Sequence, residues 1–432
     1  MIGKLYPLFL ESSGVSTDSR AILPRSIFFA LKGERFDGNS FAIKALEAGA
    51  SYAVIDDPNL LSDDRLIFTE DVLTTLQQLA THHRCKLGIP IVALTGTNGK
   101  TTTKELITAV LSTEYNVTST SGNLNNHIGV PLTILKMGCD TEIGVVEMGA
   151  SAPGEIALLS AIARPDVGLI TNVGKAHLLG FGSFDGVKRT KGELYDYLVL
   201  NGGVALVDYD SPDLREMAGE RQGMETTPYG AEYQHVETLP PLAEYPYLRI
   251  RFRNGTLLST KLVGGYNTGN IMAALAVGDY FGIGFDTSIK AIESYIPRNN
   301  RSQLKSYREN LFVVDTYNAN PTSMRAALEN FAVTDFPQKR LILGDMLELG
   351  SDSLKEHRAI LDFIAGLDDI ELSYFVGSEF RSAAAKFQVA AGAFQFFDTS
   401  TDLRECLNNE NSKGKTFLVK GSRGVRLEAI FD

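Results

Sequence analysis

The sequence predicts an α/β protein of three domains whose middle part is a mostly parallel sheet. The chain has 432 residues, more than one ordinary core holds, so two or three domains are expected. From residue 90 onward, short apolar runs alternate with helical stretches, which favours parallel strands covered by helices. Breaks near Gly88–Pro90 and Pro297–Arg301 divide the chain into residues 1–84, 85–298 and 299–432.

The first segment mixes short strands with helical stretches. Ile27–Leu31 and Ser51–Ile55 are apolar runs of strand length. From Asp71 to Cys85 the apolar residues recur at helical spacing, so we expect a helix there. The segment is predicted to form a small α/β domain.

The middle segment carries the clearest alternation of strands and helices. Near its end, an Asn254-Gly255 pair between two alternating runs, 247–252 and 257–263, predicts a β-hairpin. A long helix is expected to begin near Asn267. The strands and helices expected before the hairpin are Ile91–Leu94, Lys104–Leu111, Ile143–Val146, Ile156–Ile162 and Val167–Ile170.

The last segment resumes the alternation and predicts a Rossmann-like domain. It lacks a Gly-x-Gly-x-x-Gly run, so a dinucleotide-binding role is not supported. The strands expected in it are Leu311–Val314, Leu341–Leu343, Tyr374–Val376 and Phe417–Val419.

Composition and charge exclude several classes of protein. Hydrophobic residues make up 44% and charged residues 22%, the balance of a soluble globular protein. A net charge of −11 argues against a broad nucleic-acid surface, because phosphate backbones need a basic footprint. No stretch approaches the roughly 18 apolar residues of a membrane span, and three scattered cysteines indicate free thiols. We therefore expect a cytoplasmic protein, and a monomer.

The sharpest local signal is the run Thr95-Gly-Thr-Asn-Gly-Lys-Thr-Thr-Thr103. It follows a predicted strand and opens a predicted helix, which is the setting of a phosphate-binding loop. Lys100 can reach the outer phosphates, and Thr101 can offer its hydroxyl to Mg²⁺. The position five residues before Gly99 is Leu94, not glycine, so this is a shorter variant of the general pattern.

Polar residues follow the next two predicted strands. Glu147 ends one apolar run, and His177 follows another by a few residues. The carboxyl ends of parallel strands form the ligand crevice, so Glu147 beside the loop suits a Mg²⁺ ligand. Spacing alone leaves His177 open between a structural and a functional role, and it favours a solvated surface for Lys191.

The ordered set of motifs resembles the Mur ligase superfamily over essentially the whole chain. Within it, the runs Tyr317–Pro321 and Gly344–Gly350 are similar to the branch that adds D-alanyl-D-alanine to a UDP-N-acetylmuramoyl-tripeptide. Two positions depart from the family pattern: Tyr266 stands where histidine is frequent, and Thr316 where a second acidic residue is frequent. The other matching motifs are residues 17–20, 28–33, 36–38, 95–103, 122–131, 147–150, 170–177, 267–274, 301–303 and 420–423, together with Asp315 before the Tyr317–Pro321 run.

The resemblance implies ATP and Mg²⁺ as cofactors, and roles for individual residues. Catalytic roles fall on Lys100, Glu147, His177 and Lys191, with Lys191 at the position of a carbamylated lysine. Metal ligation falls on Thr101, Glu147, His177 and Lys191. ATP contacts fall on Gly96, Thr97, Asn98, Gly99, Lys100, Thr101, Thr102, Asn270, Arg301 and Asp315. Contacts to the nucleotide-peptide or the dipeptide fall on Ser19, Arg20, Lys32, Gly33, Asn123, Tyr317, Asn318, Asn320 and Arg423.

The implied activity is an ATP-dependent ligation through an acyl phosphate, in cytoplasmic peptidoglycan precursor synthesis. The implied partners are the UDP-N-acetylmuramoyl-tripeptide and D-alanyl-D-alanine. Three alternatives stay open: the preceding ligase, which adds lysine or diaminopimelate; a folate-polyglutamate ligase; and a non-catalytic nucleotide-binding module. The absence of an Asp-x-Pro-Arg run in residues 299–432 disfavours the preceding ligase, and Lys100, Glu147, His177 and Lys191 disfavour an inactive module.

Overall fold

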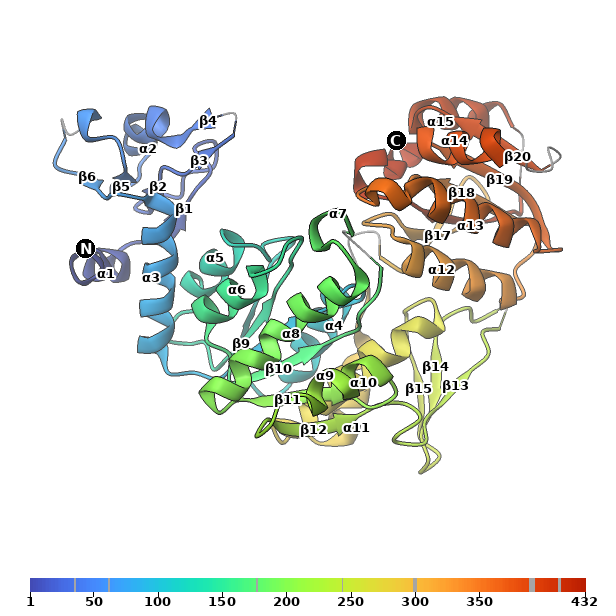
Figure 1. Cartoon of the computed structure of the whole chain (residues 1–432), viewed down its shortest axis with the longest axis horizontal. Helices are drawn as coiled ribbons and strands as arrows, with labels where there is room; N and C mark the ends of the chain where they lie inside the picture. The colour runs from blue at the N-terminus through green and yellow to red at the C-terminus, as the bar shows by residue number, and fades with distance from the viewer. Residues whose placement is uncertain are drawn as a thin grey trace.

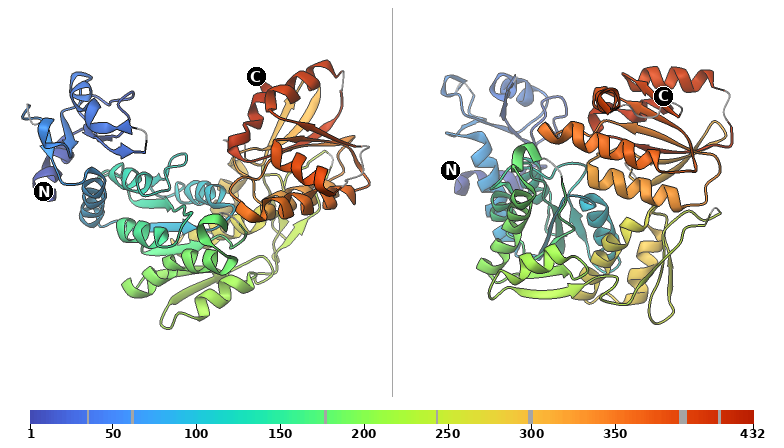
Figure 2. Two further views of the ribbon diagram at one scale, coloured as in Figure 1. Left: turned by 45° about the horizontal axis from the view of Figure 1, so that its top comes forward. Right: turned by 45° about the vertical axis from the view of Figure 1, so that its right-hand side comes forward.

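The computed structural model contains three α/β domains, as the sequence predicts (Figure 1). The N-terminal and C-terminal domains stand apart, and the middle domain connects them below (Figures 1 and 2). Within the described residues, no helix is long and apolar enough to cross a membrane. The structure describes residues 1–34, 36–60, 63–175, 178–242, 244–297, 301–387, 393–410 and 413–432.

The N-terminal domain is built on a parallel sheet of strand order β1-β2-β5-β6. Two very short strands, β3 (Lys32–Gly33) and β4 (Phe36–Asp37), form a separate antiparallel ribbon. The predicted strands at 27–31 and 51–55 are present and slightly shorter. The remaining elements are α1 (Ile2–Glu11), β1 (Val15–Ser16), β2 (Ile27–Phe29), α2 (Ala42–Glu47), β5 (Tyr52–Ile55) and β6 (Leu66–Phe68).

Helix α3 (Val72–Leu87) joins the first domain to the second. Asp71 caps its first turn by accepting the Thr74 N–H, and Gly88 ends it in the left-handed region with φ 64°. Arg84 is buried and donates to the carbonyls of Ala163 and Arg164, which end a helix of the middle domain. The boundary expected at residue 84 therefore falls inside a helix that packs on the middle domain.

The middle domain has a six-stranded parallel sheet in the order β12-β11-β10-β7-β9-β8. Helices cover both faces, so its central strands are apolar on both sides. The elements are β7 (Ile91–Thr95), α4 (Lys100–Leu111), β8 (Val117–Ser119), α5 (Gly129–Leu135), β9 (Ile143–Glu147), α6 (Glu155–Ala163), β10 (Val167–Ile170), α7 (Leu178–Phe181), α8 (Phe184–Asn201), β11 (Val204–Asp208), α9 (Pro212–Gly219) and β12 (Glu225–Tyr229).

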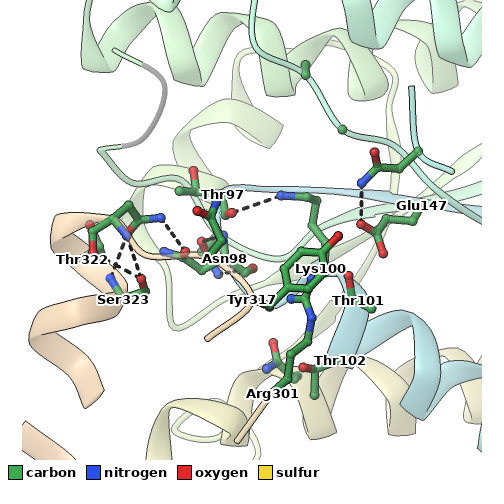
Figure 3. Close-up of a pocket in the computed structure, with 18 of the residues that line it drawn as sticks. Thr97, Asn98, Lys100, Thr101, Thr102, Glu147, Arg301, Tyr317, Thr322 and Ser323 are labelled. Carbon is green, nitrogen blue, oxygen red and sulfur yellow. Dashed lines mark hydrogen bonds between the residues drawn. The ribbon is translucent and has the colours of Figure 1, made fainter. Parts of the chain in front are cut away.

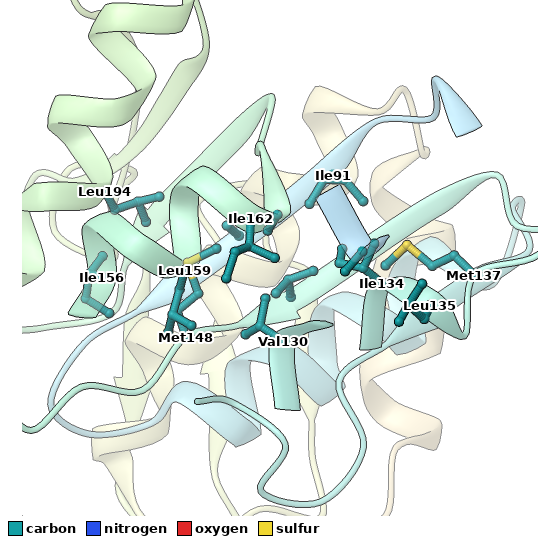
Figure 4. Close-up of a cluster of buried hydrophobic side chains, with 14 of the residues drawn as sticks. Ile91, Val130, Ile134, Leu135, Met137, Met148, Ile156, Leu159, Ile162 and Leu194 are labelled. Carbon is teal, nitrogen blue, oxygen red and sulfur yellow. The ribbon is translucent and has the colours of Figure 1, made fainter. Parts of the chain in front are cut away.

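Alternate residues of strand β7 face two separate cores. Ile91 packs with residues of α5 and α6 in one fully buried cluster (Figure 4). Val92 and Leu94 face the other side and pack against α4 and the later helix α10 (Thr268–Tyr280). Side chains alternate between the two faces of a strand, so a strand covered by helices on both faces is buried along its whole length. The phosphate loop therefore follows directly from a buried strand at Thr95.

The predicted hairpin belongs to a three-stranded antiparallel sheet, β13 (Glu237–Leu239), β14 (Arg249–Arg251) and β15 (Leu257–Ser259). Gly255 has a φ of 87° at its turn, as an Asn-Gly turn demands. Helices α10 (Thr268–Tyr280) and α11 (Phe285–Ser294) complete the domain. The helix expected near Asn267 is thus present.

The C-terminal domain has a six-stranded sheet in the order β16-β17-β21-β18-β19-β20, parallel except at the edge strand β16. The four predicted strands occupy its centre. The elements are β16 (Gln303–Tyr307), β17 (Asn310–Asp315), α12 (Pro321–Val333), β18 (Lys339–Gly344), α13 (Ser353–Ala365), β19 (Ile370–Val376), α14 (Ser378–Phe387), β20 (Phe394–Phe397), α15 (Ser400–Asn409) and β21 (Thr416–Lys420).

Candidate active site

The phosphate loop lies between β7 and α4, and two glycines give it its shape. Gly96 has a φ of 143°, and a Cβ there would lie 2.1 Å from the Thr171 hydroxyl oxygen. Gly99 has a φ of 78°, and a Cβ there would lie 2.4 Å from Asn270 Oδ1. Any larger residue at either position would strain the backbone and collide with a neighbour.

The loop opens directly into the N-terminus of α4. The first backbone N–H groups of a helix have no partner within it, and the helix dipole places partial positive charge there. Thr101 and Thr102 are buried in this first turn and line the cavity in front of it. The arrangement suits a phosphate group.

Lys100 is folded back onto the loop. Its Nζ donates to the carbonyls of Gly96 at 2.7 Å and Thr97 at 3.0 Å. Burial lowers the pKa of Lys100, while the charge of Glu147 opposes that shift and the charge of Arg301 adds to it. The flexible side chain can exchange these two carbonyls for the oxygens of a phosphate.

Glu147 ends β9 beside the loop and is 2% exposed. Its Oε1 accepts a hydrogen bond from Asn125 Nδ2 at 2.8 Å, and its Oε2 has no partner among the described residues. Figure 3 shows this carboxylate facing the same space as Lys100. A buried carboxylate oxygen without a partner is costly, so the position fits a cation.

The C-terminal domain contributes the opposite wall. The Arg301 guanidinium stacks 3.6 Å from the centre of the Tyr317 ring (Figure 3). Asp315 pairs with the buried Lys420 at 2.5 Å, at the ends of two adjacent parallel strands. Together these residues fix two cationic groups at the edge of the sheet that faces the phosphate loop.

The two walls enclose a cavity of about 650 Å³ between the middle and C-terminal domains. Most of the residues expected to contact ATP line it, although they come from segments more than 200 residues apart. The expected residues that line it are Thr97, Asn98, Gly99, Lys100, Thr101, Thr102, Glu147, Asn270, Arg301, Asp315, Tyr317, Asn318 and Asn320.

Lys191 does not line that cavity; it is buried on α8. Its exposed fraction is 2%, and its Nζ lies 5.4 Å from the centre of the Phe181 ring. Burial first, and then the charge of Lys100, lowers the pKa of Lys191 to about 7. The solvated surface that spacing favours is therefore wrong. His177 lies outside the described residues.

Three further expected residues of the middle and C-terminal domains do not line the cavity: Gly96, Asn123 and Arg423. Asn123 is exposed in the loop before α5. Arg423 is exposed in the turn after β21, with its guanidinium carbon 5.4 Å from the centre of the Tyr317 ring. Tyr317 thus lies near two arginines, but Arg301 alone of the two reaches the cavity wall.

The expected uridine-binding residues lie in the N-terminal domain, away from this cavity. Arg20 pairs with Asp18 at 2.7 Å, and this pairing lowers the pKa of Asp18 to about 2. Lys32 pairs with Asp56 at 2.8 Å on the β3–β4 side of the domain. Ser19 is half-buried next to Arg20, and Gly33 is exposed next to Lys32.

The cavity also contains polar residues that sequence reasoning did not select. Asn125 holds Glu147, and it lies two residues after the selected Asn123 in the same run. Lys420 opens the Lys-Gly-Ser-Arg motif from which only Arg423 was chosen. The other lining residues of this kind are Asn126, His127, Ser151, Glu155, Asn172, Tyr266, Asn267, Ser302, Thr322 and Ser323.

Comparison with known proteins gives consistent matches along the chain. Family models match at residues 11–92 (Mur ligase family, catalytic domain), 94–278 (Mur ligase middle domain) and 300–423 (Mur ligase, glutamate ligase domain). The UDP-N-acetylmuramoyl-tripeptide–D-alanyl-D-alanine ligase of Bacillus subtilis (strain 168) is 38% identical over 427 residues, which cover 96% of this chain and 92% of that protein.

Two solved structures are similar over nearly the full length. MurF from Acinetobacter baumannii superposes with a TM-score of 0.85 at 31% identity, covering 96% of this chain and 92% of that one. MurF ligase from Thermotoga maritima, solved in complex with ADP, superposes with a TM-score of 0.84 at 30% identity, covering 98% and 96%.

A phosphate loop, a strand-end carboxylate and a second α/β domain closing over both define the class: an ATP-dependent ligase that forms a C–N bond. The chain belongs to the Mur ligase family.

Proposed function

We propose that this chain joins D-alanyl-D-alanine to a UDP-N-acetylmuramoyl-tripeptide at the expense of ATP. The observation that carries the proposal is the shared cavity, in which Lys100 and Glu147 of the middle domain face Arg301 and Asp315 of the C-terminal domain. The names of the full-length relatives support this substrate pair over a lysine- or diaminopimelate-adding ligase. The product is the pentapeptide precursor of peptidoglycan.

The reaction needs activation because a carboxylate has no acceptable leaving group. A carboxylate oxygen of the tripeptide attacks the γ-phosphorus of ATP, and ADP leaves. The amine nitrogen of the dipeptide then attacks the acyl carbon, loses a proton, and inorganic phosphate leaves with the former carboxylate oxygen. Lys100 and the loop N–H groups stabilise the phosphoryl charge, and Arg301 is placed to do so from the opposite wall.

The residues present fit Mg²⁺ bound together with the triphosphate. Such an ion keeps several waters and takes one or two carboxylates plus phosphate oxygens, so Glu147 Oε2 and the Thr101 hydroxyl suffice as protein ligands. When bound, the ion neutralises the phosphate oxygens. Among the described residues no cluster of three His, Cys, Asp or Glu side chains could hold a metal alone. His177 is proposed as a further ligand on family resemblance.

A carbamate on Lys191 is a second element of the proposal. Only an unprotonated amine adds CO₂, and a pKa of about 7 leaves a large unprotonated fraction at neutral pH. The carbamate would replace a buried cation beside Lys100 with an anion, which removes a like-charge repulsion. Its test is a bicarbonate-dependent gain in thermal stability of the wild-type protein that Lys191→Met abolishes; equal gains in both proteins would exclude the carbamate.

The N-terminal domain is assigned the uridine nucleotide. Lys32 and Arg20 are exposed cations that already pair with Asp56 and Asp18, so a phosphate would have to compete with those carboxylates. We place the protein in the cytoplasm as a monomer. Three free cysteines agree with a reducing compartment.

The decisive experiment is a phosphate-release assay that crosses nucleotide-peptides against candidate amines. Phosphate release should require ATP, the tripeptide and D-alanyl-D-alanine together. Lys100→Ala should abolish release while circular dichroism stays unchanged, and the matched control Lys136→Ala, at an exposed lysine, should retain it. Full activity of Lys100→Ala would refute the proposed function. Phosphate release that does not depend on the amine would refute it as well.

A further inference from the structure

One hydrogen bond joins the phosphate loop directly to the C-terminal domain. Asn320 Nδ2 donates to Asn98 Oδ1 at 2.7 Å, although the two residues lie 222 positions apart. Asn320 is 6% exposed, so water competes little for this bond. Figure 3 shows Asn98 close to Thr322 and Ser323, the first residues of α12 after its proline.

Asn320 uses both ends of its side-chain amide. Its Oδ1 caps α12 by accepting the Ser323 N–H at 2.9 Å, while the Ser323 hydroxyl accepts the Asn320 N–H at 3.1 Å. Its Nδ2 is therefore the end left to reach the other domain. The reciprocal cap fixes the rotamer, so the donor is aimed before any ligand binds.

The backbone of Asn98 is held without help from its side chain. Its N–H donates to Asn172 Oδ1 at 2.9 Å, and its carbonyl accepts from the Thr171 hydroxyl at 2.6 Å and from Asn172 Nδ2 at 3.0 Å. The side chain is thus free to serve the contact with Asn320. Removing it should leave the loop in shape.

We infer that the Asn98–Asn320 bond is a clasp that couples occupation of the phosphate loop to closure of the amine-binding domain. The inference rests on the proposed function. Closure brings the N-terminus of the thirteen-residue helix α12, with Thr322 and Ser323, against the phosphate side of the cavity. Asn98 and Asn320 are positioning residues, because they act through the placement of α12.

The clasp predicts a defined failure when it is lost. The acyl phosphate would still form on the loop, but an unlatched domain would admit water to the acyl carbon. Water would then take the place of the amine, giving back the tripeptide carboxylate and inorganic phosphate. Phosphate would be released without a matching peptide bond, which a general loss of stability does not produce.

Two variants and two controls test this. Asn320→Ser keeps a good helix cap but is too short to reach Asn98, and Asn98→Ala removes the acceptor. Each should raise the KM for D-alanyl-D-alanine roughly threefold to tenfold, the worth of one hydrogen bond. The ratio of peptide bonds to phosphate should fall well below one in both, and no further in the double variant.

The controls separate capping and docking from the clasp. Ser323→Ala removes half of the cap but leaves Asn320 able to donate to Asn98, and Glu356→Gln weakens the separate interdomain pair with Lys175. Both should keep a ratio near one. If Asn98→Ala and Asn320→Ser still formed one peptide bond per phosphate released, the clasp would be overturned. An equally low ratio of peptide bonds to phosphate in Ser323→Ala would also overturn it.

A measurement without turnover keeps the clasp distinct from the proposed function. With a non-hydrolysable ATP analogue bound, amide hydrogen exchange in residues 318–324 should slow in the wild type and change little in Asn98→Ala. Equal protection in both proteins would overturn the clasp. If the wild-type protein did not join the dipeptide to the tripeptide, the proposed function would be overturned. The hydrogen-exchange result would still test the clasp, because it does not depend on turnover.

Discussion

Replacing Lys191 by methionine should stabilise the protein, and the gain should depend on pH. Burial lowers the pKa of Lys191 from 10.5 to about 7. In CO₂-free buffer the unfolded chain therefore binds a proton that the folded protein does not hold between about pH 7 and pH 10.5. Below pH 7 the folded protein holds a buried, charged lysine, which lowers its free energy of unfolding by the full amount. This reduction shrinks as the pH rises above 7 and disappears as the pH passes 10.5.

The size of the effect follows from the shift. Each pKa unit corresponds to about 1.4 kcal/mol, so a pKa lowered to about 7 reduces the free energy of unfolding by a few kcal/mol, at most about 5 kcal/mol, at pH 7 or below. Methionine has similar length and no charge, so Lys191→Met should recover much of that amount. Urea unfolding at pH 7.0 and pH 9.5 measures it, and the gain should be smaller at pH 9.5.

Lys188, on the same helix α8, provides a matched control of opposite sign. The hydrogen bond to Glu216 is the largest cause of the raised pKa of Lys188. The charged side chain therefore stabilises the folded protein below pH 10.5, and this contribution is lost above that pH. Lys188→Met should lose about 1 kcal/mol or less, since the pair is partly exposed. A wild type and a Lys191→Met protein with the same pH dependence of unfolding would refute the reasoning.

Three further predictions concern the loop, the metal site and the interdomain helix. Gly99→Ala should weaken ATP binding by at least tenfold in calorimetry, because a left-handed φ costs roughly 1–2 kcal/mol and the new Cβ meets Asn270; unchanged affinity would contradict the loop geometry. Glu147→Gln should abolish the Mg²⁺ dependence of ATP binding while leaving weak metal-free binding, and an unaltered Mg²⁺ titration would remove Glu147 from the site. Arg84→Met should lower the free energy of unfolding by about 3 kcal/mol, because two carbonyls and Asp166 lose a buried partner; a loss below 0.5 kcal/mol in urea unfolding would show that the contact is dispensable.

The elements that the sequence predicts best have both a regular hydrophobic spacing and capping residues at their ends. Asp71 and Gly88 bracket the predicted helix, and the structure uses both as its caps. The edge strand β16 and the short strands β8 and β12 were not predicted. They are short or only half-buried, so their hydrophobic pattern is weak.

The positions of candidate site residues were predictable where one short run carries them, as for Lys100 and Glu147, which line the cavity. It was not predictable where contacts join distant segments. The bond between Asn98 and Asn320 leaves no local signal, and neither does the burial of Lys191, which depends on how α7 and α8 pack. Within the loop before α5, no periodicity distinguishes Asn125 from Asn123; only the folded loop brings Asn125 to Glu147.

The measurement that tests the central claim most directly follows oxygen from the tripeptide carboxylate. With ¹⁸O in that carboxylate, the account predicts that each inorganic phosphate carries one labelled oxygen, because the carboxylate oxygen attacks phosphorus before the amine arrives. Unlabelled phosphate formed alongside labelled pentapeptide would contradict it and would require a different route of activation.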